Sequence, residues 1–159
     1  MNVLYEKMIP KEPLEKFTSL CNVQELLIGG PSFHQGAAIV KAYDVRANDA
    51  AQASPCLVNF HGGAAIGGTA EQANPFCARY AVMCKAVVIN VEYRLAPEHK
   101  APAGIDDGYA ALKWVIANAE DLGIDPTRIA IIGESGGGYI TAGVAMRLAE
   151  RREGGLVRF

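Results

Sequence analysis

The chain has 159 residues, of which 50% are hydrophobic and 20% are charged, a composition typical of one globular domain with a sizeable core. The formal net charge of −2 and the lack of lysine and arginine runs argue against a basic surface for nucleic acid or acidic membranes. No apolar stretch approaches the ~20 residues of a membrane span, and no secretory signal is visible, so we expect a cytoplasmic protein.

The first part of the chain predicts a short helix followed by an antiparallel hairpin. Residues 11–20 show helical spacing, whereas residues 23–28 and 37–45 are strand-like runs joined by the turn-rich stretch GGPSFHQG. A polar loop, residues 46–55, follows the second of these runs. The hairpin would form the antiparallel opening of a sheet.

From residue 56 onward, short continuous apolar runs alternate with longer segments of helical spacing. In chain order, strands are expected at 56–60, 86–93 and 129–133, and helices at 72–84, 104–123 and 137–152. This alternation predicts an α/β fold with a mostly parallel sheet, right-handed crossovers and helices on both faces. Wholly apolar strands suit burial on both faces of such a sheet.

Two glycine-rich stretches follow predicted strands and indicate acyl-transfer chemistry. The pattern G-x-S-x-G appears as GESGG at residues 133–137, with Ser135 at a sharp strand-to-helix turn that would expose its hydroxyl. The N–H of Gly136, at the start of the helix, would then face an oxyanion. The stretch HGGA at residues 61–64 follows another strand, and parallel strands end at one common edge. We therefore expect HGGA to supply the other half of an oxyanion hole.

Three segments of the chain resemble the hormone-sensitive-lipase-like branch (fold 3) of the α/β-hydrolases, which includes arylacetamide-deacetylase-like and other carboxylesterases. These segments are VNFHGGAAIGG, VVINVEYRLAPEHKAPAGIDDGYAALKWV and DPTRIAIIGESGGGYITAGVAMR. They cover most of residues 56–150 in the family's order, and the run YRLAPEH is especially specific to this branch. The resemblance implies one partial hydrolase domain, with its core in residues 21–159 and a possible cap or lid segment in residues 1–20.

The resemblance implies that Ser135 is the nucleophile of an ester hydrolase that forms an acyl-enzyme with small hydrophobic esters. The oxyanion would be held by the N–H groups of Gly63, Ala64 and Gly136, and Gly62 would shape the loop. Two departures from the family pattern are present. Ala64 replaces the third glycine of H-G-G-G, and G-E-S-G-G replaces the common G-D-S-A-G. Ala64 keeps its N–H but restricts the backbone, and G-E-S-G-G keeps the small positions small. No metal or other cofactor is expected.

A serine nucleophile needs a base, but no histidine follows Ser135 in the sequence. Because the family order is serine, acid and then histidine, the resemblance implies a chain truncated after the nucleophile helix. Such a chain lacks the triad Asp and His and would be weak or inactive alone. The closing GGLVRF suggests the start of another strand. The strand at 129–133 would then have an exposed edge, which favours self-association.

The histidines upstream of Ser135 are His34, His61 and His99, and all three favour structural interpretations. His61 could form a triad with Asp107 and Ser135 in another chain order. However, His61 leads directly into the HGGA loop, so a hydrogen bond that holds this loop is the favoured interpretation. His34 lies in the predicted hairpin turn, and His99 lies in a loop.

The acidic side chains near these motifs also favour structural interpretations. Asp106 and Asp107 lie at the start of the helix predicted for 104–123, where carboxylates cap free N–H groups and favour the helix dipole. Glu134, next to Ser135, is expected to brace the turn.

The cysteines show no metal-site or disulfide pattern. Cys21, Cys56, Cys77 and Cys84 form no C-x-x-C pair and do not cluster with histidine. We therefore expect free thiols in a reducing compartment and no metal site.

Two other functions are compatible with the same scaffold. One is a non-catalytic protein that binds a small ligand, as in the plant gibberellin receptor of this branch. The other is a peptidase or an acyltransferase, because the same turn and oxyanion hole serve any acyl transfer.

Overall fold

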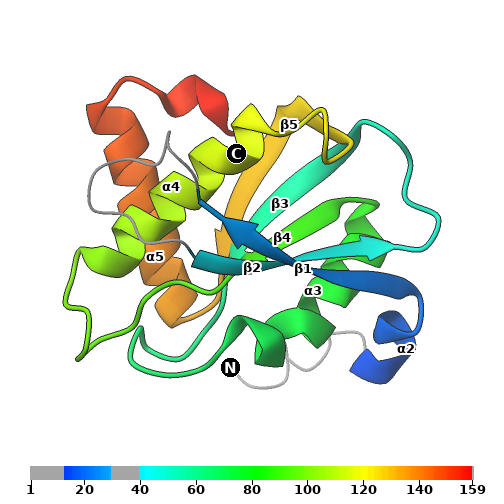
Figure 1. Ribbon diagram of the computed structural model, residues 1–159, viewed down its shortest axis with the longest axis horizontal. Coiled ribbons are helices and arrows are strands. Elements are labelled where there is room, and N and C mark those ends of the chain that lie inside the picture. Colours follow the sequence, from blue (N-terminus) through cyan, green and yellow to red (C-terminus); the bar gives the residue numbers. More distant parts are fainter. Residues whose placement is uncertain (1–12, 30–39, 159) are drawn as a thin grey trace, which may run out of the picture.

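The computed structural model describes residues 13–29 and 40–158, in which a five-stranded sheet has helices on both faces (Figure 1). The strands are β1 (Cys21–Ile28), β2 (Val40–Ala47), β3 (Ser54–Phe60), β4 (Val87–Val91) and β5 (Ile124–Gly133). The helices are α2 (Leu14–Thr18), α3 (Ala70–Cys84), α4 (Ala103–Ala117), α5 (Gly136–Glu150) and the short 3₁₀ helix η1 (Gly154–Leu156). The predicted α/β fold class is confirmed.

The sheet is mixed, with the strand order β1-β2-β4-β3-β5. β1 and β2 pair antiparallel along their whole length, which confirms the expected hairpin strands. β2 is also antiparallel to β4, whereas β3 is parallel to both β4 and β5. The turn predicted between the hairpin strands, which contains His34, lies outside the described residues, as do residues 37–39 and residues 1–12.

β5 begins at Ile124, ahead of the DPTR stretch that reads as a turn in the sequence. Its pairing with β3 shifts register between Ser54 and Cys56, so the DPTR residues bulge out of the ladder. The Asp125 carboxylate accepts hydrogen bonds from the N–H and the hydroxyl of Thr127, at 2.9 and 2.7 Å, and these bonds stabilise the bulge. The sequence pattern thus locates the bulge at DPTR, but it does not predict that Ile124 before the bulge already pairs with β3.

The three long predicted helices are confirmed, with shifted bounds. α3 begins at Ala70, earlier than the helical spacing indicates, because the Thr69 hydroxyl accepts the N–H of Gln72 at 3.2 Å and caps the helix. α4 ends at Ala117, and the chain continues in turns to Gly123. Gly123 has a φ of 64°, the left-handed conformation in which glycine is favoured.

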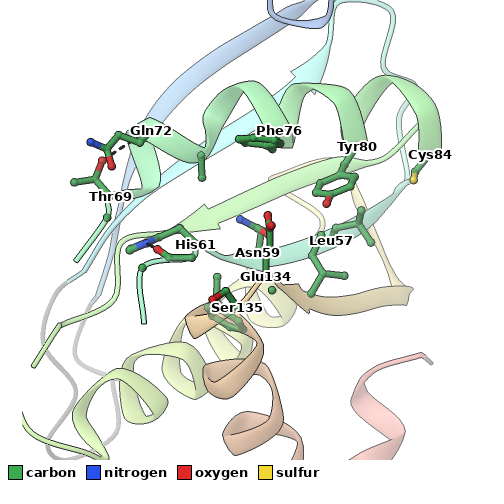
Figure 2. A pocket seen from close by; sticks show the side chains of 17 residues that line it. Leu57, Asn59, His61, Thr69, Gln72, Phe76, Tyr80, Cys84, Glu134 and Ser135 are labelled. Carbon is green, nitrogen blue, oxygen red and sulfur yellow. Dashed lines mark hydrogen bonds between the residues drawn. The ribbon is translucent and has the colours of Figure 1, made fainter. Parts of the chain in front are cut away.

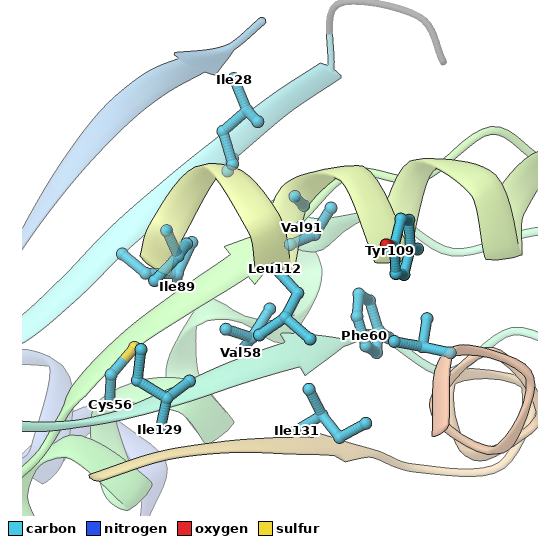
Figure 3. Packing of buried hydrophobic residues seen from close by; sticks show 14 of the residues in the cluster. Ile28, Cys56, Val58, Phe60, Ile89, Val91, Tyr109, Leu112, Ile129 and Ile131 are labelled. Carbon is cyan, nitrogen blue, oxygen red and sulfur yellow. The ribbon is translucent and has the colours of Figure 1, made fainter. Parts of the chain in front are cut away.

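Two apolar layers bury the central strands. On one face, Val58 and Ile89 pack in a cluster with α4 and α5, and Figure 3 shows Leu112 of α4 pointing into this layer. On the other face, Leu57 and Val88 pack with small side chains of α3. Because strand side chains alternate between faces, burial on both faces explains why the central strands are mostly apolar. This packing fixes the starts of α3 and α5 beyond the carboxyl ends of β3 and β5.

The last described residues lie beside β5, which is the end strand of the sheet. Val157 has an extended backbone and is only 3% exposed. The N–H of Arg158 donates to the Ile129 carbonyl at 2.8 Å, and its Nε donates to the Thr127 carbonyl at 3.0 Å. Residues 154–158 therefore form η1 followed by a short extended segment on the outer edge of β5.

The four cysteines are free thiols that differ in their access to solvent. Cys56 and Cys77 are buried, and burial raises the pKa of both thiols, that of Cys77 to about 12. Cys21 is partly buried, and burial also raises its pKa. Cys84 is exposed at the end of α3.

We expect iodoacetamide at neutral pH to alkylate Cys84 first, because access and thiolate formation control the rate. Mass spectrometry after a short exposure of the folded chain measures the order of alkylation. Cys84→Ser should remove the fast-reacting fraction. Rapid alkylation of Cys77 in the folded chain would contradict the packing of α3 on the sheet.

Candidate active site

Ser135 stands at a tight turn between β5 and α5. Its backbone has φ 53° and ψ −115°, a conformation that residues other than glycine rarely adopt. The N–H of Gly137 donates to the Glu134 carbonyl at 2.8 Å and closes the turn. Such a conformation costs on the order of 1–3 kcal/mol, so the surrounding packing must maintain it. GESGG therefore has the strand–turn–helix setting that the sequence predicts.

The packing of this turn requires small residues on both sides of Ser135. A Cβ atom at Gly133 would lie 2.6 Å from Oγ1 of Thr141. A Cβ atom at Gly137 would lie 2.6 Å from the carbonyl carbon of Phe60. Both distances are too short for non-bonded atoms. The start of α5 therefore lies directly against the end of β3, which brings Ser135 next to the HGGA stretch.

The HGGA loop folds back on itself beside the turn. The Gly63 carbonyl accepts the N–H groups of Ile66 and Gly67, both at 3.0 Å. Gly63 and Ala64 have positive φ angles, 126° and 55°. A left-handed conformation costs alanine on the order of 1 kcal/mol more than glycine. Ala64 therefore keeps the N–H of the third family glycine at some cost in backbone strain.

Backbone N–H groups from the two glycine-rich segments lie close to Ser135. A Cβ atom at Gly136 would lie 2.5 Å from the amide nitrogen of Ala64, and one at Gly62 would lie 3.9 Å from the Ser135 Cβ. Within residues 13–29 and 40–158, no acceptor is hydrogen-bonded to the N–H groups of Gly63, Ala64 or Gly136. Available donors at a helix N-terminus can stabilise a negatively charged oxygen.

His61 contacts the HGGA loop rather than Ser135. Its Nδ1 lies 2.8 Å from the Gly62 carbonyl oxygen, and its Nε2 lies 3.6 Å from a carboxylate oxygen of Glu92. The ring stacks on Tyr93, with centroids 4.4 Å apart. Neither ring nitrogen is hydrogen-bonded to Ser135. These contacts favour the loop-holding interpretation over a catalytic base.

Asp106 and Asp107 do not cap the helix as the sequence suggests. α4 begins at Ala103, so Asp107 lies inside the helix, fully buried, and points to the chain after β4. Its carboxylate accepts the Arg94 N–H at 2.9 Å, Nε at 2.8 Å and Nη2 at 2.7 Å. Asp106 instead pairs with Arg147 of α5. Both residues are structural, but they join different parts of the chain rather than cap one helix.

The chain after β4 anchors the HGGA loop, a role that the sequence does not reveal. The Tyr93 hydroxyl donates to the His61 carbonyl at 2.7 Å, and the Ala96 N–H donates to the Ala65 carbonyl at 3.0 Å. Arg94, held by its buried carboxylate partner, fixes the segment between these two bonds. The specific run YRLAPEH is the signal that marks these residues, although it does not indicate which contacts they make.

A cavity of about 700 Å³ opens beside Ser135 (Figure 2). Its walls include Leu57 of β3 and the aromatic rings of Phe76 and Tyr80 on α3. Burial raises the pKa of Tyr80, and the Glu134 carboxylate adds to this effect. The Glu134 side chain is exposed on the cavity wall and does not brace the turn. Its backbone carbonyl instead accepts the Gly137 N–H and closes the turn.

A second, smaller cavity borders the HGGA loop. It has a volume of about 180 Å³, and its lining includes Ile66, Ile105, Tyr139 and His99. His99 is exposed, and its N–H donates to the Leu95 carbonyl at 2.9 Å. Its position agrees with the structural interpretation of this histidine.

Known proteins share this arrangement of segments. The sequence profile of the α/β hydrolase fold family matches residues 57–158. The chain belongs to the α/β hydrolase fold family. This α/β-hydrolase-fold chain is 50% identical to carboxylesterase NlhH of Mycobacterium tuberculosis over 91 residues, which are 57% of the chain and 28% of NlhH.

A solved structure agrees with this assignment. The hyperthermophilic esterase from the archaeon Pyrobaculum calidifontis is 36% identical, with a TM-score of 0.80 over 91% of the chain and 45% of the esterase. The gibberellin receptor of Oryza sativa subsp. japonica is 38% identical over 105 residues, which are 64% of the chain and 30% of the receptor. The α/β-hydrolase-fold chain thus spans less than half the length of each relative. The resemblance to carboxylesterases of the hormone-sensitive-lipase-like group is confirmed.

The described part of this α/β-hydrolase-fold chain offers neither a metal-binding cluster nor a membrane helix. No three His, Cys, Asp or Glu side chains within it gather closely enough to hold a metal ion. Likewise, none of its helices combines the length and the hydropathy needed to cross a bilayer.

Proposed function

We propose that this chain carries the nucleophile and the oxyanion hole of a carboxylic-ester hydrolase. Ser135 Oγ attacks the ester carbonyl carbon, the alcohol leaves with a proton, and water then hydrolyses the acyl-enzyme. The N–H groups of Gly63, Ala64 and Gly136 hold the negative oxygen of each tetrahedral intermediate. Gly62, without a side chain, lets the loop approach Ser135.

The observation that carries this proposal is the position of one exposed serine beside backbone N–H groups from two separate segments. Ser135 is exposed at the start of α5, and the Ala64 amide nitrogen lies against Gly136. Esterases are prominent among the similar proteins, and this similarity favours an ester over an amide as the substrate.

Activation of Ser135 is the step for which the described residues offer no partner. His61 is engaged with Gly62 and Glu92, and His99 does not line the cavity beside Ser135. A serine hydroxyl without a base is a poor nucleophile at neutral pH. We therefore propose that residues 1–159 alone are weakly active or inactive, and that full turnover needs an acid and a histidine base.

A fluorophosphonate should modify the folded chain slowly and only at Ser135. The reagent needs a serine oxygen and a site for a negative oxygen, and it reports the first chemical step alone. Intact-mass measurement and peptide mapping identify the adduct. Hydrolysis of p-nitrophenyl acetate, which needs repeated proton transfer, should remain close to the rate of the Ser135→Ala variant.

The Ser135→Ala variant is the control for both measurements. It should form no adduct and should unfold at the same urea concentration as the unmodified chain. Absence of an adduct in the unmodified chain would refute Ser135 as a nucleophile. Ester turnover far above the Ser135→Ala rate would instead refute the proposed need for a further base.

The alternative is a non-catalytic ligand-binding protein on the same fold, favoured by the similarity to the rice gibberellin receptor. This function requires that small hydrophobic ligands raise the melting temperature while Ser135 remains unmodified by the fluorophosphonate. The receptor-like function would be supported if the ligand raised the melting temperature equally in the unmodified chain and in Ser135→Ala, and if the fluorophosphonate formed no adduct with the unmodified chain.

A further inference from the structure

His61 is a buried histidine whose two ring nitrogens both face oxygen atoms. Nδ1 lies 2.8 Å from the Gly62 carbonyl oxygen. Nε2 lies 3.6 Å from Oε1 of Glu92, an ion-pair distance, and has no hydrogen-bond partner. The residue is only 2% exposed, and its ring stacks on Tyr93 at an interplanar angle of 17°. The ring is therefore fixed by its neighbours.

A neutral imidazole cannot satisfy both of these oxygens, because it carries only one N–H. With Nδ1 protonated, the lone pair of Nε2 would face the Glu92 carboxylate. With Nε2 protonated, the lone pair of Nδ1 would face the Gly62 carbonyl. Only the doubly protonated ring presents an N–H to each oxygen, and its positive charge then pairs with Glu92.

Glu92 is itself held in the charged form. Its Oε2 accepts the N–H of Ala70, the first residue of α3, at 2.7 Å, where the helix dipole favours a negative charge. Burial favours the neutral acid, but the contacts with His61 and Ala70, aided by the charge of Lys41, lower the pKa of Glu92. The backbone N–H of Glu92 also donates to the Lys41 carbonyl at 2.9 Å, so the sheet fixes its position.

We infer that Glu92 is a positioning residue for the oxyanion loop. Its carboxylate keeps His61 doubly protonated and directs Nδ1–H to the Gly62 carbonyl, which orders the HGGA loop beside Ser135. The effect on acyl transfer rests on the proposed function, whereas the effect on the His61 ring does not. The ion pair also leaves His61 no nitrogen to accept the Ser135 proton.

The test of the ring state compares Glu92→Gln with the unmodified chain. Glutamine keeps an oxygen for the Ala70 N–H but removes the charge. Glu71→Gln is the matched control, because it removes the same charge from an exposed position in the first turn of α3. ¹⁵N–¹H correlation spectra of the imidazole rings near neutral pH should show two protonated His61 nitrogens in the unmodified chain and in Glu71→Gln. Glu92→Gln should show one.

Two results would overturn the inference about the ring. One is a singly protonated His61 in the unmodified chain, and this measurement decides the matter even if Glu92→Gln does not fold. The other is an unchanged His61 ring in a folded Glu92→Gln variant.

The rate of phosphonylation at Ser135 tests the positioning role. Glu92→Gln should react roughly tenfold more slowly, a smaller loss than the ~10²–10³-fold expected when an oxyanion donor is removed. Glu71→Gln should react at the unmodified rate. Equal rates in Glu92→Gln and the unmodified chain would overturn the positioning role. If the unmodified chain does not react at all, the proposed function fails, while the ring spectra still decide whether Glu92 sets the state of His61.

Discussion

Replacing Asp107 by asparagine is expected to lower the free energy of unfolding by about 3 kcal/mol, because breaking a buried ion pair leaves its partner charge uncompensated. Asp107 is fully buried and accepts hydrogen bonds from the backbone N–H, Nε and Nη2 of Arg94. Asparagine has nearly the same size but cannot pair with both guanidinium nitrogens. Urea unfolding followed by circular dichroism measures the loss.

Asp106→Asn is the matched control for this prediction. Asp106 is adjacent in sequence, but its side chain is 31% exposed and its partner Arg147 is on the neighbouring helix. The pair is partly screened by solvent, so its removal should cost less than about 1 kcal/mol. Equal losses in the two variants would show that burial of the Arg94–Asp107 pair does not control stability.

Replacing Gly137 by alanine is expected to cost about 3 kcal/mol or more, the upper range for overpacking, because the new Cβ would meet backbone rather than a movable side chain. This Cβ would lie 2.6 Å from the Phe60 carbonyl carbon and 2.8 Å from the His61 carbonyl oxygen. α5 would have to move away from β3, which would also displace Ser135 from the HGGA loop. Both the urea midpoint and the rate of fluorophosphonate labelling should fall.

Gly138→Ala is the control, because Gly138 is the next residue of the same helix. A Cβ atom there would lie 3.5 Å from the Gly133 carbonyl, an ordinary contact. Alanine is favoured over glycine in helices by up to about 1 kcal/mol, so this variant should be neutral or more stable. If Gly137→Ala were as stable as Gly138→Ala, the close approach of α5 to β3 would be wrong.

The central part of the fold could be predicted because its signals are local. β3, β4 and the second half of β5 are marked by short apolar runs, and the helices between them repeat apolar residues at helical spacing. The polar residues inside the strands give no such signal. Asn59 Nδ2 donates to Asn90 Oδ1 at 2.8 Å, and Asn90 Nδ2 donates to the Ala70 carbonyl at 2.6 Å. This network joins β3, β4 and α3, and it depends on strand order, which a single sequence does not specify.

The parts of the candidate site that depend on close contacts between main chains could be predicted from the sequence. Glycines at fixed spacing around Ser135 reflect close approach of main chains, so their positions are readable from the sequence. The support of the site could not be predicted in the same way. Glu92 and Arg94 act through residues that lie close only in the folded chain, so their roles become visible once β4 is placed beside β3.

Val157 and Arg158, the short segment after η1, limit where a further strand could pair with β5. The Ile129 carbonyl points to the outer side of β5, where it accepts the Arg158 N–H. Because successive strand residues alternate in direction, the backbone N–H and carbonyl of Ile131 point to the same side. Among the described residues, the part of β5 without a neighbour on this side lies beyond this contact, toward Ser135. Val157 and Arg158 thus cover one end of this edge. They shorten the stretch of β5 on which another strand could pair and begin a fibril-like ladder.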